Sequence, residues 1–331
     1  MTRYITTDDF RDVYIKAKQR GLDFILSKFT FSETARTKSA FNETKKVSAD
    51  WWSIPYVTQR WNSLITGKSD QNYEEFLLQE TFAQQEGLSL LSIGSGESSR
   101  EMRLAKSKAF QQITCLDLSD YRMNKARQIA LEQGLTTMEF ICANIYEHDF
   151  KHQVYDYVLF NASLHHFKEI PSFLAHQILP LLATDGKLII NEFVGATRLQ
   201  FPNHQLKAIN QALQLIPHKY RKRLKTSLYK KSYSGSGIIR MILADPSECI
   251  DSERILPSIH QLFDVEFEKG YGGNILANVL KDIAHHFHEL DPEKKQVLDA
   301  LFAFEDKYLE KHPSDFVFGI YKKKKLLHSE R

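Results

Sequence analysis

The stretch that decides the fold is Leu88-Ser89-Leu90-Leu91-Ser92-Ile93-Gly94-Ser95-Gly96-Glu97-Ser98-Ser99-Arg100. An apolar run stops at a Gly-Ser-Gly turn and a helix-compatible segment follows, which predicts a strand, a tight turn and a helix start. Glycine suits this turn because the chain reverses sharply and a ligand can approach the backbone. Two ligands stay open here: a dinucleotide bound by a G-x-G-x-x-G pattern, in which Ser99 replaces the third glycine, or an adenosine-containing ligand without a pyrophosphate.

The composition is that of an ordinary globular chain. Its 331 residues are 42% hydrophobic and 26% charged, and the net charge of +3 is too small to indicate nucleic acid by itself. Three distant cysteines argue against a disulfide framework. We expect no secretory leader, since Asp8, Asp9, Arg11 and Asp12 come early in the chain, and we find no apolar run approaching the roughly 20 residues of a membrane helix. We therefore expect a cytoplasmic protein without a membrane segment.

Short apolar runs alternate with helical patterns after the glycine turn. Further strands are predicted at 112–118, 138–143, 155–160 and 187–193, with helices at 101–110, 120–133 and 170–182 between them. Such alternation predicts an α/β fold with a parallel, doubly wound sheet, whose ligands bind beyond the carboxyl ends of the strands. Polar or glycine residues stand at all five ends: Gly94, Asp117, Asn144, Asn161 and Glu192. Asp117 follows Gly94 by 23 residues, close to the spacing of about 20 at which an acid meets a ribose hydroxyl.

The segments outside this core are mostly helical. We predict a helix at 5–30 with an apolar face, and a loop at 31–48. Later helices are expected at 72–86, 202–232, 238–244, 274–288 and 292–311, with another starting at Asp245, and strands at 263–268 and 316–322. The expected apolar face of the first helix consists of Phe10, Val13, Tyr14, Ala17 and Leu22.

We divide the chain into four parts. They are a helical N-terminal arm with an aromatic lid (1–70), a Rossmann-like core (71–195), a helical substrate cap (196–262), and C-terminal strands and helices that complete the sheet (263–331). All three tryptophans lie within 51–61. This aromatic segment is a packing anchor, a lid over a ligand, or both together.

The motifs resemble those of the class I S-adenosylmethionine-dependent methyltransferases, small-molecule type. The resemblance covers residues 86–195, and a weaker one to a bacterial branch includes Gly272-Gly273. The motifs are Ser92-Ile93-Gly94-Ser95-Gly96, Cys115-Leu116-Asp117-Leu118-Ser119, Cys142-Ala143-Asn144, Tyr155-Asp156-Tyr157-Val158-Leu159-Phe160-Asn161-Ala162-Ser163-Leu164-His165-His166 and Asp185-Gly186-Lys187-Leu188-Ile189-Ile190. The resemblance implies a Rossmann-like sheet of seven strands with the last strand antiparallel.

It also implies S-adenosyl-L-methionine as cofactor, with S-adenosyl-L-homocysteine as product. The cofactor-binding residues would be Gly94, Ser95, Gly96, Asp117, Leu118, Asn144, Ile145, Asn161 and Ala162. Asp117 would hold the ribose, Asn144 the adenine edge, and Asn161 the methionine end. The chain departs from the family at Ser92, where an acidic residue is common, at Ser98, where a third glycine is common, and at Asn144, which is usually acidic.

Three residues are candidates for the catalytic chemistry. His165 and His166 follow the fourth strand and titrate near neutral pH, so either can serve as a general base. Glu192 can orient or deprotonate an acceptor, or form an ion pair with Arg198 or Arg240. His285, His286 and His288 lack a completing ligand pattern, and we predict no metal site.

The acceptor is less well defined by the sequence. Candidate substrate contacts are Trp52, Tyr56, Arg60, Arg198 and Arg240. The basic segment 218–231 is interpreted as a solvated face, with an anionic substrate as the alternative.

We predict methyl transfer by in-line displacement to an oxygen or nitrogen of a small-molecule acceptor, in a monomer or homodimer. The alternatives are a nucleic-acid methyltransferase and a cofactor-binding module without catalysis. Nucleic acid is not expected, because no Asn-Pro-Pro-Tyr-like motif follows the fourth strand. An NAD-dependent oxidoreductase is the least favoured.

Overall fold

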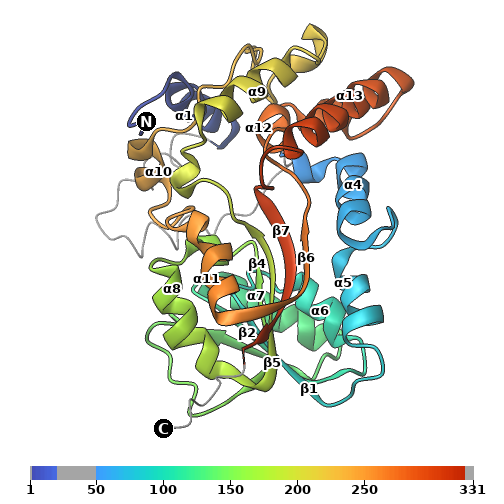
Figure 1. Cartoon of the computed structure of the whole chain (residues 1–331), viewed down its shortest axis with the longest axis vertical. Coiled ribbons are helices and arrows are strands. Elements are labelled where there is room, and N and C mark those ends of the chain that lie inside the picture. The colour runs from blue at the N-terminus through green and yellow to red at the C-terminus, as the bar shows by residue number, and fades with distance from the viewer. Residues whose placement is uncertain (1, 21–49, 325–331) are drawn as a thin grey trace. The chain divides into compact units, whose positions relative to one another are not determined.

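A computed structural model describes residues 2–20 and 50–324, and these form two compact units (Figure 1). The sheet unit comprises 72–194, 251–269 and 317–324. The helical unit comprises 2–20, 50–71, 195–250 and 270–316. The four-part division made from the sequence stays a prediction. Among the described residues, no helix has both the length and the apolar character needed to cross a membrane.

The sheet has seven strands in the order β3-β2-β1-β4-β5-β7-β6. Neighbours from β3 to β5 pair in parallel, and the last strand is antiparallel, so the predicted fold class is confirmed. The bounds are β1 Leu88–Ile93, β2 Phe110–Asp117, β3 Met138–Cys142, β4 Tyr155–Asn161, β5 Leu182–Phe193, β6 Phe263–Gly270 and β7 Phe316–Lys323.

Helices cover both faces of this sheet, as strand alternation requires. Ile141 of β3 packs on the core beneath α8 (Ile170–Phe173) and α11 (Ile255–Leu262), which lie together in Figure 1. The preceding residue, Phe140, packs against α6 (Ser99–Ala105) and α7 (Asp120–Glu132) on the opposite face. The carboxyl ends of β2, β1, β4 and β5 therefore lie side by side at one edge.

Two predicted helices of the sheet unit are shorter and less regular than expected. The helix expected at 72–86 is α5 (Tyr73–Phe76), followed by a π-helical turn at Leu77–Thr81. Asn72 and Glu75 form a capping box that fixes its start. The helix expected at 170–182 is α8, then a π-helical turn at Leu174–Ile178 and a 3₁₀ turn at Leu179–Leu181, which contains Pro180.

The helical unit contains six α-helices among its described residues. They are α1 (Thr7–Arg20), α4 (Pro55–Thr66), α9 (Asn203–Leu213), α10 (Ile238–Ala244), α12 (Leu276–Leu280) and α13 (Pro292–Leu309). Helices α9, α12 and α13 pack against one another (Figure 1). Short 3₁₀ turns lie at Trp51–Ser53, Thr197–Leu199, His218–Arg221 and Ala284–Phe287, and the sheet unit has another at Ser252–Arg254.

The prediction for the first helix was wrong about its buried face. Phe10 is 70% exposed and Val13 is 46% exposed, whereas Asp8, Asp9 and Asp12 are buried. Asp9 accepts hydrogen bonds from the Gly237 amide (2.9 Å) and the Arg240 guanidinium (2.8 Å), and these bonds replace an apolar contact. Residues 21–48 of the predicted helix and loop lie outside the described residues.

Three further predictions in the helical unit were wrong in extent. The helix expected at 202–232 ends at Leu213, and the basic segment beyond it forms a loop closed by an antiparallel bridge between Lys222 and Tyr229. Asp245 starts no helix; its carboxylate accepts from the Ser247 amide (2.9 Å) and closes a turn. The helix expected at 274–288 is interrupted between α12 and the turn at Ala284–Phe287.

Candidate active site

The glycine turn after β1 is fixed by contacts within the protein. Gly94 has φ +69°, and a Cβ there would lie 2.6 Å from the Cβ of Ser163. Its amide donates to the Leu116 carbonyl at 2.7 Å. Gly96 has φ +58°, but a Cβ there would meet only the Arg122 guanidinium, at 3.5 Å. The first glycine is therefore required by packing against the loop after β4, while the second leaves the backbone accessible.

Asp117 ties the end of β2 to this turn. One carboxylate oxygen accepts from the Gly96 amide at 2.9 Å, and the other accepts from the Ser119 amide at 2.8 Å. The Ser119 hydroxyl in turn accepts from the Arg122 amide and caps α7. Each carboxylate oxygen has further acceptor capacity. The glycine turn and Asp117 are thus in direct contact.

The residues expected beside adenine lie after β2 and β3. Leu118 is half-buried, and Ile145 belongs to the apolar core under α8. The Asn144 side chain closes a local turn: its oxygen accepts from the Tyr146 amide (3.2 Å), and its amide donates to Glu147 (2.8 Å).

Asn161 and Ala162 follow β4. The Asn161 side-chain oxygen accepts from the Tyr73 hydroxyl (2.8 Å) and from the Asn191 amide group (2.9 Å), which orients the Asn161 amide group as a donor. Ala162 is exposed and has φ +51°, a left-handed conformation that costs a non-glycine residue energy. Its amide donates to the Asn191 carbonyl at 2.8 Å.

Tyr73 and Arg100 are parts of this region that sequence reasoning missed. The Arg100 guanidinium donates to the Tyr73 hydroxyl (2.8 Å) and to Glu74 (3.0 Å). Burial raises the pKa of Tyr73, so the phenol keeps its proton and donates to Asn161. The capping box at Asn72 indicates the helix start, but no pattern links Tyr73 with a residue 88 positions later.

Glu192 organises the loop after β4. One of its carboxylate oxygens accepts from the amides of Ser163 (2.6 Å) and Leu164 (2.7 Å), and the other lies 2.7 Å from Nδ1 of His165. Both Glu192 and His165 are buried. Because a carboxylate only accepts, Nδ1 of His165 carries a hydrogen, and in the neutral form of the ring Nε2 carries the lone pair. The ion pairs with Arg198 or Arg240 that the sequence left open are replaced by these contacts.

His166 lies directly beside this pair. The rings of His165 and His166 have centroids 4.3 Å apart, on the 3₁₀ turn Leu164–His166. His166 is half-buried. Both predicted histidines therefore share one short turn.

A second buried carboxyl, Glu101, was also missed. It accepts from the Ser92 hydroxyl at 2.7 Å, and burial raises its pKa. The methyltransferases that the motifs resemble often have an acidic residue at the position of Ser92. In this chain α6 supplies a carboxyl group to that position from the opposite side of the turn.

The five predicted substrate contacts all lie in the helical unit. Tyr56 donates to Asp299 (2.7 Å), Arg60 pairs with Asp306 (2.5 Å), Arg198 donates to the Glu248 carbonyl (3.0 Å), Arg240 pairs with Asp9 (2.8 Å) and Asp12 (3.3 Å), and Trp52 is 45% exposed. Four of these side chains thus have structural partners within their own unit. Their contact with an acceptor stays a prediction.

The aromatic segment serves as a packing anchor in the helical unit. Trp51 is buried and packs edge-on against Trp61, with ring centroids 4.5 Å apart, and against Phe316. Gly273, with φ +87°, is required beside them, because a Cβ there would lie 2.3 Å from the Phe316 ring.

Comparison with known proteins gives a family for part of the chain. Residues 84–236 match the family described as a methyltransferase domain. These residues contain the glycine turn, Asp117 and the His165–Glu192 pair. A search of curated proteins gave no match.

Solved structures resemble the chain at low identity. Phosphoethanolamine N-methyltransferase 2 of Haemonchus contortus, in complex with S-adenosyl-L-methionine, is 13% identical over 82% of this chain and 57% of that chain, with a TM-score of 0.47. The geranyl diphosphate C-methyltransferase of Streptomyces coelicolor is 12% identical over 76% and 78%, with a TM-score of 0.46. The [4+2]-cyclase SpnF is 18% identical over 78% and 81%, with a TM-score of 0.44. None of the three determines the acceptor of this chain.

The match over 84–236 includes the motifs that carry the resemblance, and the strand order is the one that the resemblance implies. Residues 84–236 are therefore similar to a methyltransferase domain, which makes S-adenosyl-L-methionine the cofactor to consider for the glycine turn.

Proposed function

We propose that the protein transfers a methyl group to an oxygen or nitrogen atom of a small-molecule acceptor, with His165 as general base. The observation that carries the proposal is a continuous set of contacts at the carboxyl edge of the sheet. Gly94 packs against Ser163, the Ser163 amide donates to Glu192, and Glu192 holds His165. A base is thereby built into the same loop that supports the cofactor turn.

The residues around the turn fit the cofactor. Gly96 offers accessible backbone, and Asp117 offers a carboxylate with remaining acceptor capacity for the ribose hydroxyls. Leu118, Asn144 and Ile145 would contact adenine. Gly94, Ser95, Asn161 and Ala162 would contact the methionine end, and the Asn161 amide group suits its carboxylate.

The cofactor supplies a methyl group that is already activated by its sulfonium. The protein must then orient the acceptor, exclude water and remove a proton. The Glu192 carboxylate keeps the hydrogen of His165 on Nδ1 and stabilises the imidazolium that forms when Nε2 takes the proton. His166 would position the acceptor beside it.

The substrate contacts, oligomeric state and location are also part of the proposal. Trp52, Tyr56, Arg60, Arg198 and Arg240 would meet the acceptor, in a monomer or homodimer. The free thiols of Cys115, Cys142 and Cys249 support a cytoplasmic location.

Methyl-labelled cofactor tests this proposal. The full chain is incubated with labelled S-adenosylmethionine and a cell extract, and the products are separated into low-molecular-mass, nucleic-acid and protein fractions. We expect label in the low-molecular-mass fraction, a large loss with His165→Ala, and no loss with His176→Ala, an exposed histidine of the same unit. Label that gathers in nucleic acid, or cofactor binding without any transfer, would contradict the proposal.

A further inference from the structure

The basic segment of the helical unit folds into a defined loop. Lys222 and Tyr229 form an antiparallel bridge, and the Arg223 amide donates to the Leu228 carbonyl at 2.8 Å. At the tip, Lys225 has φ +56°, and the Thr226 hydroxyl donates to the Arg223 carbonyl at 3.1 Å. We call residues 222–229 the basic loop. Its backbone is closed by its own hydrogen bonds, unlike that of a solvated basic run.

Buried charges fix the basic loop to the segment after α12. The Arg223 side chain is only 5% exposed and pairs with Asp282. The Leu224 amide donates to the Asp282 carbonyl at 2.9 Å. Directly after the loop, the buried ammonium of Lys230 donates to the carbonyls of Asn278 (2.5 Å) and Lys281 (2.8 Å). Side chains on the loop are therefore presented from a rigid base.

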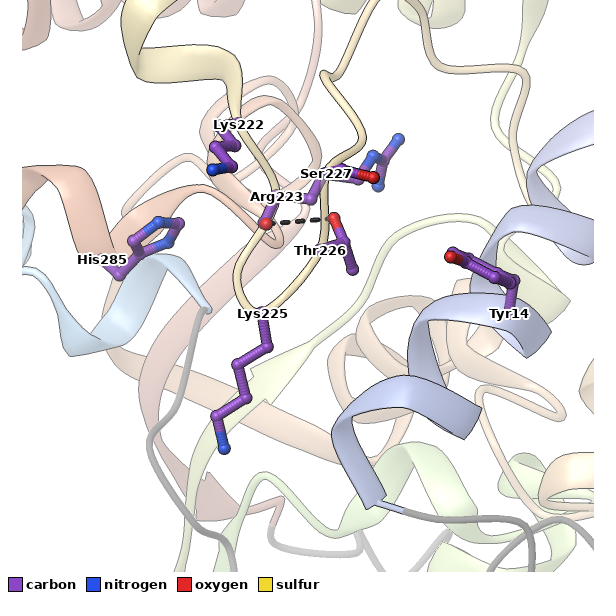
Figure 2. A pocket seen from close by; sticks show the side chains of 7 residues that line it. All are labelled: Tyr14, Lys222, Arg223, Lys225, Thr226, Ser227 and His285. Atoms are coloured by element: carbon purple, nitrogen blue, oxygen red, sulfur yellow. Dashed lines mark hydrogen bonds between the residues drawn. The ribbon is translucent and has the colours of Figure 1, made fainter.

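The basic loop borders a cavity of about 510 Å³, a size that suits a small ligand. Figure 2 shows Tyr14 and His285 on opposite sides of the loop, with Lys222 and Lys225 leaving it at different points. The described residues that line the cavity are Tyr14, Lys222, Arg223, Lys225, Thr226, Ser227 and His285.

The lining offers cationic groups and hydroxyls, and no carboxylate among its described residues. Arg223 contributes a guanidinium whose pairing with Asp282 occupies one nitrogen. In the described part of the chain, the ammonium groups of Lys222 and Lys225 form no ion pair, and the Ser227 hydroxyl forms no hydrogen bond. A wall of this composition favours an anion over a cation or an apolar molecule.

His285 is a neutral member of the lining. Among the residues that the structure describes, none forms a hydrogen bond with its buried Nδ1. Burial lowers the pKa of His285 to about 4, and the neighbouring His286 and His288 add to the effect, so the ring is neutral at pH 7. The neutral ring leaves the positive charge of the lining to Lys222, Lys225 and Arg223.

We propose that this cavity binds a small phosphate-bearing anion with more than one negative charge. Lys222, Lys225 and the Arg223 guanidinium would neutralise it, and the Ser227 hydroxyl would donate to its oxygens. The site lies within the helical unit, and its lining residues are not those proposed for methyl transfer. A failure of pyrophosphate binding would therefore leave the proposed function unaffected, and a failure of methyl transfer would leave this site unaffected.

Isothermal titration of the full chain with inorganic pyrophosphate, at fixed ionic strength, tests the site. We expect saturable binding that weakens at least about tenfold in the double variant Lys222→Ser/Lys225→Ser. The matched control is Lys231→Ser, which removes an exposed lysine one residue beyond the loop anchor and outside the cavity. It should change the affinity by less than about twofold.

Thermal unfolding shows whether the double variant is folded; both lysines are exposed, so its midpoint should match that of the wild type. If it does not, the single variant Ser227→Ala must weaken pyrophosphate binding while Lys231→Ser does not. Absence of binding to the wild type would overturn the proposal. So would equal losses for all lysine variants, which indicate diffuse attraction, or binding of a single-stranded oligonucleotide with no binding of pyrophosphate.

Discussion

In the sheet unit, Asp117 and Glu192 are buried at the carboxyl edge and accept hydrogen bonds from backbone amides 21 and 29 residues away. In the helical unit, the buried charges pair over much longer separations. Arg240 contacts Asp9 from 231 residues away, and Lys281 contacts Asp12 from 269 residues away. Contacts of the first kind assemble a site from residues that are 21 and 29 positions apart in the sequence. Contacts of the second kind hold distant parts of the chain together.

This difference explains why mutations in the two units should have different effects. A buried carboxylate that accepts from loop amides sets the geometry of reacting groups, so its loss should reduce activity. A buried ion pair without a reacting partner should affect stability, because one buried charge would be left unpaired.

The largest effect is expected at His165. Replacing His165 with alanine should lower methyl transfer by about 10²–10⁴-fold, the usual contribution of a general base. Initial rates across pH provide the measurement, and the rise of the wild-type rate with deprotonation of an imidazole should be lost. If the His165→Ala variant kept the wild-type rate and pH profile, His165 would not be the general base, and the sheet unit would not have the chemical role assigned to it here.

Gly94 should be the next most sensitive position. Gly94→Ala places a Cβ 2.6 Å from Ser163 at positive φ, and overpacking of this kind costs about 1–3 kcal/mol. Gly134→Ala, at φ +67° with nothing within 4 Å, is the matched control and should cost about 1 kcal/mol from backbone strain alone. Urea denaturation compares the two, and equal losses would show that Ser163 does not constrain the turn.

A smaller effect is expected in the helical unit, on how the free energy of unfolding depends on pH. Burial lowers the pKa of Lys230 to about 7, below its value of 10.5 in the unfolded chain. Between these values the unfolded state binds more protons, so Lys230 makes stability rise with pH from about 7 and adds no pH dependence below that. Urea denaturation from pH 6 to 9 measures this slope, and Lys230→Met should flatten it. A Lys230→Met variant with an unchanged slope would show that the ammonium is not desolvated.

The sheet unit was largely predictable from sequence, because each strand is a short apolar run that ends at a polar residue. Gly94, Asp117 and Glu192 come to one edge as a direct consequence of parallel strands. The Asp117–Gly96 hydrogen bond joins the ends of the neighbouring strands β1 and β2, so it follows from the same arrangement. The link from Tyr73 to Asn161 does not, because it depends on how α5 packs on the sheet.

The helical unit was less predictable for a physical reason. The pattern of Phe10, Val13 and Tyr14 predicted an apolar buried face, but hydrogen bonds to Asp8 and Asp9 outweigh it. Besides the local contacts with Thr6 and Arg11, their partners lie at Ser234 and beyond, and no local pattern connects residues so far apart. The basic loop was likewise expected to be a solvated helix, since nothing before the structure indicated that Arg223 is buried against Asp282.

The central claim is that the glycine turn and Asp117 form the cofactor site, and calorimetric titration with S-adenosylmethionine tests it most directly. The wild type should bind, Asp117→Ala should weaken binding by about 1.5–3 kcal/mol, the value of hydrogen bonds to a charged group, and Asp149→Ala, an exposed carboxylate of the same unit, should not. Undiminished binding by Asp117→Ala would contradict the account.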